Sequence, residues 1–133
     1  MPQQSNDSFE DIAQVIRKHL DDRGWLNNPS RGLAISIALE ANELLEHYQW
    51  KEEPVGDKQA IAAELADILI YAFQFADAND IDIAAAIRHK LELSAKKYPL
   101  SEFNKGISAE ERQANWRKRK IRMIKTGEEE QSA

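Results

Sequence analysis

Two stretches decide how this chain folds: LEANELLEHYQW at residues 39–50 and AAELADILIYAF at residues 62–73. Both carry acids at three-residue spacing, namely Glu40, Glu43, Glu46, Glu64 and Asp67. Residues three and four positions apart share one face of a helix. The remaining positions are mostly apolar and recur at helical spacing. The pattern therefore predicts two helices, each with a row of acids beside an apolar stripe.

The acids lie within these apolar stripes or at their edges. Glu40 shares a helix face with Ile37 and Leu44, and Glu64 follows Ile61 by three residues. A carboxylate on a half-buried face is costly unless it is paired or bound to a metal. The simplest alternative is a solvated acidic surface.

Basic partners for the acids are missing from both segments. Residues 33–50 and 59–80 contain no Lys or Arg, and His47 is the one imidazole within them. A divalent cation would compensate the carboxylates, and all-oxygen ligands favour Mg²⁺ or Mn²⁺ over Zn²⁺. A di-iron centre ranks low because it needs Glu-x-x-His pairs, which neither His47 nor His89 completes.

The composition describes a globular protein. The 133 residues suit one domain, predicted to span residues 1–133 with a core at about 8–99. Apolar residues make up 42% and charged residues 31%. The chain has no Cys, which excludes disulfides and a thiol nucleophile. No run approaches the ~20 apolar residues of a membrane span, and the N-terminus lacks signal-peptide features, so we expect a cytoplasmic protein without a membrane partner.

The rest of the chain also reads as helical, because alternating β-branched runs are absent. Five helices are predicted, at residues 8–22, 30–50, 57–78, 80–97 and 108–125. Ser8, Asp57 and Ser108 are the expected N-terminal caps. The fold class is therefore predicted to be all-α, a bundle of four to five helices with the second, third and fourth at its centre.

The last predicted helix is basic, and it surrounds Trp116 with Arg and Lys. Such a run can bind nucleic acid. It is more often a solvated or oligomer-docking face, and the net charge of −5 makes nucleic acid an unlikely partner. A third possibility is that its cations reach into a site of a neighbouring subunit.

The acid spacing carries a family resemblance. Glu40-Ala-Asn-Glu43, followed after 20 residues by Glu64-Leu-Ala-Asp67, resembles the E-x-x-E, E-x-x-D motif of MazG-type all-α nucleoside triphosphate pyrophosphohydrolases. The surrounding segments 43–51, 64–71 and 96–99 resemble the branch that contains the dCTP pyrophosphatases. The resemblance covers about residues 25–99.

The resemblance implies a fold, a reaction and a metal site. Family members are helical bundles that form dimers or tetramers, and they hydrolyse an NTP or dNTP to the monophosphate and pyrophosphate with Mg²⁺. Glu40, Glu43, Glu64 and Asp67 match the catalytic metal ligands. Glu46 is a spare acid, which either supports the metal ligands from one turn away or is simply exposed, and exposure is favoured. A house-cleaning role, removing unwanted nucleotides, is one expectation.

The resemblance also implies substrate-binding residues: Trp25, Trp50, Lys51, Tyr71, Lys90, Lys97 and Tyr98. The aromatic residues among them fit base recognition, although ordinary core packing explains them equally well. Ser94 and Asn28 stand where the family often has Asn and His. The identity of the base is therefore not carried over.

Three hypotheses follow. The first is a Mg²⁺-dependent pyrophosphohydrolase, which the intact acid pairs favour. The second is a non-catalytic helical module that binds a nucleotide or a protein, and the third is a nucleic-acid-associated protein that acts through its last helix. Because the second and third helices are apolar on several sides, a homo-oligomer is also predicted.

Overall fold

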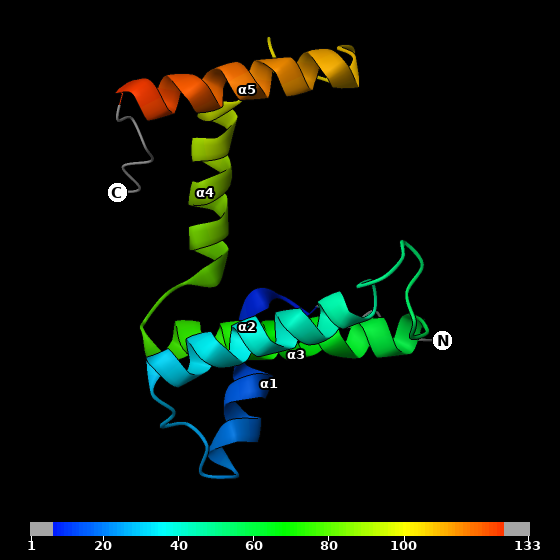
Figure 1. The fold of residues 1–133 in the computed structure, drawn as a ribbon. Helices are drawn as coiled ribbons and strands as arrows, with labels where there is room; N and C mark the ends of the chain where they lie inside the picture. Colours follow the sequence, from blue (N-terminus) through cyan, green and yellow to red (C-terminus); the bar gives the residue numbers. More distant parts are fainter. Residues whose placement is uncertain (1–6, 127–133) are drawn as a thin grey trace. The chain divides into compact units, whose positions relative to one another are not determined.

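The computed structural model describes residues 7–126, and this part of the chain contains five helices and no strand (Figure 1). The helices are α1 (Phe9–Asp21), α2 (Ser30–Glu46), α3 (Lys58–Ala78), α4 (Ile83–Lys97) and α5 (Ala109–Thr126). The predicted all-α class is confirmed.

The expected caps form at three helix starts. Ser8 and Asp11 make a reciprocal capping box at α1. The Asp57 side chain accepts a hydrogen bond from the Ala60 N–H at 2.9 Å, and the Ser108 hydroxyl accepts one from the Glu111 N–H at 3.1 Å. These bonds satisfy amide donors that have no partner within their own helix.

Helix α2 ends earlier than predicted, at Glu46 rather than at residue 50. His47 is the C-cap of the helix, and its carbonyl accepts a hydrogen bond from the Val55 N–H at 2.8 Å. Residues 47–56 therefore close a loop in place of the expected last helical turn.

The chain divides into two compact units, one up to Ala86 and one from Ile87 onward. In the first unit α2 and α3 lie side by side (Figure 1). Ser30 is hydrogen-bonded to Asn79 at one end of this pair, and His47 to Glu64 toward the other. These two contacts define an antiparallel arrangement and its register.

Helix α1 packs on α3 within the same unit. The Phe9 and Phe73 rings stack with centroids 5.7 Å apart. Arg17 donates two hydrogen bonds to the Asp77 carboxylate, at 2.7 and 3.2 Å. The buried side chains of the described residues are Leu20, Leu33, Gln74 and Ala76. The core of the unit is therefore small and lies between these three helices.

The second unit places α5 against the loop that follows α4. Arg119 donates two hydrogen bonds to the Glu102 carboxylate, at 2.8 and 2.9 Å. The Asn115 amide donates to the Glu102 carbonyl at 3.0 Å, and Tyr98 meets Phe103 edge to face at 5.1 Å. The basic helix is thus anchored to its own loop. The predictions of one domain and of α4 in a shared centre stay predictions.

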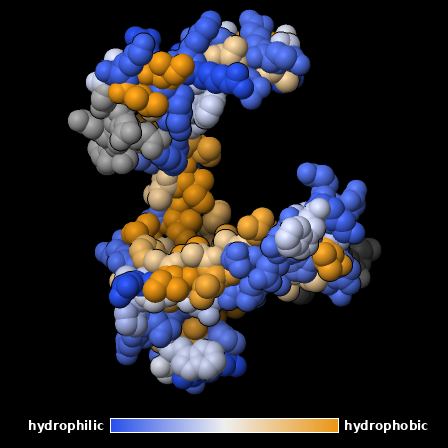
Figure 2. Space-filling model, in the orientation of Figure 1, coloured by the Kyte–Doolittle hydropathy of each residue, from blue (hydrophilic) through white to orange (hydrophobic). Residues whose placement is uncertain are grey.

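Much apolar surface of α2 and α3 is left exposed, and Figure 2 shows hydrophobic side chains gathered over this pair. The exposed large residues there are Ile35, Leu39, Leu45, Leu65, Leu69 and Ile70. By length and composition alone, α3 is also able to cross a membrane. Core helices of soluble proteins meet the same criteria. The expected absence of a membrane partner therefore stays a prediction.

Candidate metal centre

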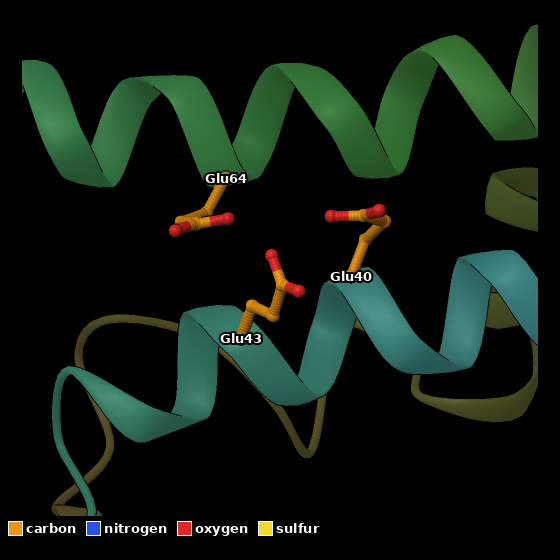
Figure 3. Close-up of side chains that lie close together, drawn as sticks. All are labelled: Glu40, Glu43 and Glu64. Carbon is orange, nitrogen blue, oxygen red and sulfur yellow. The ribbon is translucent and has the colours of Figure 1, made fainter.

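Three of the predicted acids meet between two helices. Glu40 and Glu43 project from α2 and Glu64 from α3, all into the space between the helices (Figure 3). Each offers a carboxylate oxygen, and these oxygens lie within 4.8 Å of one another. Glu40 and Glu64 are half-buried, whereas Glu43 is exposed. Helical spacing aligns the first two acids, and the packing of α3 on α2 adds the third.

The carboxylates of Glu40 and Glu64 raise the pKa of Glu43. The charge of Glu40 is the largest cause, followed by burial and by the charge of Glu64. The cluster therefore holds more negative charge than its surroundings compensate. Its donors are all carboxylate oxygens, which fit a hard divalent cation.

His47 and Gly56 belong to this site, although the sequence did not single them out as functional. The His47 Nε2 lies 3.4 Å from a Glu64 oxygen, and the Gly56 N–H donates to His47 Nδ1 at 3.1 Å. An imidazole shortly after an acid row is a weak signal in sequence. Its contact with Glu64 depends on how the loop after α2 closes.

Two other acids lie outside the cluster. Asp67 is exposed and is not among the three grouped carboxylates, although the antiparallel register puts it level with Glu43. Its role as a ligand stays a prediction. Glu46 is exposed, as expected, and its carboxylate accepts a hydrogen bond from the Asn42 amide at 3.4 Å.

The predicted substrate-binding residues of the first unit are spread along the α2–α3 pair. Trp50, which is 85% exposed, and the exposed Lys51 lie on the loop that follows α2. Tyr71 is half-buried on α3, two turns beyond Glu64. The Trp25 carbonyl accepts a hydrogen bond from Gln74, which follows Glu64 by ten residues, or about 15 Å of helix.

The remaining predicted residues, Lys90, Lys97 and Tyr98, belong to the second unit. Their proximity to the acids stays a prediction. Lys97 Nζ lies over the Tyr98 ring, 5.4 Å from its centroid.

Together these features define an all-α protein with a carboxylate centre between two antiparallel helices. The model of the MazG-like family matches residues 35–111, and the chain belongs to that family. The predicted family resemblance is therefore confirmed.

The chain is also similar to named proteins. It is 30% identical over 105 residues to dCTP pyrophosphatase 1 of Bos taurus, covering 72% of this chain and 62% of that protein. It is 29% identical to the Homo sapiens protein of the same name over 101 residues, 69% of this chain and 59% of that one. The match thus spans about three-fifths of the length of these relatives.

A solved structure extends the similarity. The chain is 34% identical to a pyrophosphatase from Archaeoglobus fulgidus, whose crystal structure superposes with a TM-score of 0.62. That match covers 68% of this chain and 91% of the other.

Proposed function

We propose that this protein is a divalent-metal-dependent nucleotide pyrophosphohydrolase, which converts an NTP or dNTP to the monophosphate and pyrophosphate. The observation that carries the proposal is the group of three carboxylates from α2 and α3, within 4.8 Å of one another, in a MazG-like chain. The names of its relatives, dCTP pyrophosphatase 1 and pyrophosphatase, support the same reaction.

Glu40, Glu43 and Glu64 are the residues that would hold Mg²⁺ or Mn²⁺, with Asp67 as a further candidate ligand. When bound, such a cation neutralises phosphate charge and lowers the pKa of a coordinated water. The cation would also relieve the repulsion that raises the pKa of Glu43.

The reaction consumes one water and cleaves the anhydride between the α- and β-phosphates. A carboxylate of the cluster can orient the attacking water and accept its proton. The half-buried Glu40 and Glu64 are held on two packed helices, so their carboxylates are well suited to fix this geometry. Residues 33–50 and 59–80 contain no Lys or Arg that could compete for these oxygens.

A dCTP-like nucleotide is the first substrate to test, because two of the relatives carry that name. Trp50 and Lys51 lie on the loop that begins at His47, which contacts Glu64. An exposed indole offers a stacking surface for a base, and a lysine ammonium can bind phosphate. These two residues are therefore proposed to contact the nucleotide.

The exposed apolar residues of α2 and α3 support a homo-oligomer. Burial of Leu39, Leu65 and Leu69 against a second copy would remove apolar area from water, at about 25 cal/mol per Å². A dimer with twofold symmetry is the simplest closed arrangement.

The test is pyrophosphate release across a panel of NTPs and dNTPs, with and without Mg²⁺. We expect metal-dependent release, with one nucleotide preferred. Glu40→Gln, Glu43→Gln and Glu64→Gln should each lower kcat/KM by about 100-fold or more. Asp67→Asn should do the same if Asp67 is a ligand.

Glu46→Gln is the matched control, because Glu46 lies on α2 but outside the cluster. It should retain near-normal turnover. Nucleotide binding without any hydrolysis would instead support a non-catalytic module. Near-normal activity of the Glu64→Gln protein would contradict the assignment of the site.

A further inference from the structure

We propose that His47 is a positioning residue whose ring links the backbone of Gly56 to the carboxylate of Glu64. In this role it orients Glu64 and closes the loop that carries Trp50 and Lys51. The role in catalysis rests on the function proposed above, whereas the geometry of the link does not.

The two ring nitrogens of His47 have different partners. The Gly56 N–H, which can only donate, lies 3.1 Å from Nδ1. Nδ1 of the neutral ring must therefore be the acceptor, and the proton is on Nε2. Nε2 lies 3.4 Å from a Glu64 oxygen, so its N–H points toward that carboxylate. The backbone of Gly56 thus selects the tautomer that serves Glu64.

His47 also closes the loop through its main chain. Its carbonyl accepts a hydrogen bond from the Val55 N–H at 2.8 Å, while its ring accepts the one from Gly56. One residue therefore binds two consecutive amides at the far end of the loop. Trp50 and Lys51 lie between these points, and their placement depends on the closure.

Gly56 is glycine because its backbone lies against the His47 ring, and not because of a turn. A Cβ at this position would lie 2.5 Å from His47 Cε1 and 2.6 Å from Nδ1, with the Ala60 Cβ at 2.9 Å. These distances are too short for any side chain, so the ring or the backbone would have to move. Glycine is therefore required here because the imidazole lies directly against its backbone.

The link is sheltered from solvent. The side chain of His47 is 16% exposed and that of Glu64 is 21% exposed. A hydrogen bond to one oxygen restricts rotation of the Glu64 carboxylate and leaves the other oxygen available. Partners of this kind orient metal ligands, and their loss typically costs 10- to 100-fold in metal affinity.

The functional test separates the two bonds of the ring. Asn at position 47 keeps an acceptor near Nδ1 but does not reach Glu64, whereas Gln reaches Glu64 but offers no acceptor near Nδ1. We expect His47→Asn to weaken Mn²⁺ binding by about 10-fold and to leave the KM for the nucleotide near normal. His47→Gln should retain Mn²⁺ affinity and raise KM, and His47→Leu should show both defects.

Gly56→Ala should resemble His47→Leu, because it displaces the ring. Gly32→Ala is the matched control, since a Cβ at Gly32 meets no atom within 4 Å. Circular dichroism establishes that each variant is folded. Mn²⁺ affinity and KM that are unchanged in both His47→Leu and Gly56→Ala would overturn the proposal.

Nitrogen-15 NMR of the metal-free wild-type protein tests the link without any activity. At alkaline pH we expect the His47 proton on Nε2. In separate amide-exchange measurements at a common pH, we expect the Gly56 amide to exchange more slowly in the wild-type protein than in His47→Leu. A proton on Nδ1 would overturn the proposal. If the wild-type protein hydrolyses no nucleotide, the proposed function fails, whereas the tautomer and the Gly56 exchange still decide whether the link exists.

Discussion

At the scale of single residues, Glu43 is a proposed metal ligand that the charges of Glu40 and Glu64 repel when no metal is bound. Its raised pKa means that the folded state, without a metal, binds a proton more tightly than the unfolded state does. The repulsion therefore has no effect below the unfolded pKa. It develops as the pH rises from there to the raised folded pKa, and it is fully present above that value.

Glu43→Gln should consequently raise the Tm of the metal-free protein at neutral pH and abolish the stabilisation by Mg²⁺. The gain in Tm should vanish on acidification through the carboxylate range, where Glu43 is protonated in both states. Thermal unfolding in a chelator, repeated across pH, measures both effects. Glu46→Gln is the control, and a lower Tm for Glu43→Gln at neutral pH would show that the acids do not repel one another.

At the scale of helices, the Glu102–Arg119 pair connects α5 to the loop after α4. Hydrogen bonding from Arg119 is the main reason that the pKa of Glu102 is lowered. A lowered folded pKa gives stability that is present above the unfolded pKa and is lost as the pH falls through the folded one. The pair thus helps to hold α5 on this loop at neutral pH, and its contribution is lost as Glu102 becomes protonated in acid.

Glu102→Gln should therefore speed amide exchange in α5 at neutral pH, and the difference from wild type should shrink on acidification. Hydrogen exchange read by mass spectrometry, corrected for the intrinsic effect of pH, measures this. Glu92→Gln, an exposed change in α4, should leave α5 unaffected. Equal protection of α5 in the Glu102→Gln and wild-type proteins at neutral pH would contradict the proposed anchor.

At the scale of the whole molecule, the exposed apolar residues of α2 and α3 predict assembly. Leu65 is 50% exposed and Leu69 is 48% exposed, and they lie one turn apart on α3. Light scattering at low micromolar concentration should give the mass of a dimer or tetramer. The double substitution Leu65→Glu and Leu69→Glu should shift the mass toward that of a monomer, because burying two charges without partners is costly.

Val15→Glu is the matched control, because Val15 is an apolar residue on α1 that is 66% exposed. It should leave the mass unchanged. A wild-type protein that is monomeric and fully active would remove the assembly proposal and leave the carboxylate centre intact.

The sequence by itself determined the helices, most of their boundaries and the acid rows. These features are local: capping by Ser8 or Asp57 involves residues three apart, and helical periodicity alone puts Glu40 and Glu43 on one face. The lack of basic partners and the family motif together gave the expectation that the two acid rows meet.

Only the tertiary structure decided which acids come together and what supports them. The antiparallel packing of α2 on α3 brings Glu64 to Glu40 and Glu43, while Asp67 lies outside that group. The early end of α2 and the contacts of His47 arise from the closure of one loop. Contacts of this kind join residues that no helical period relates. Their geometry depends on packing between segments, which helical periodicity does not determine.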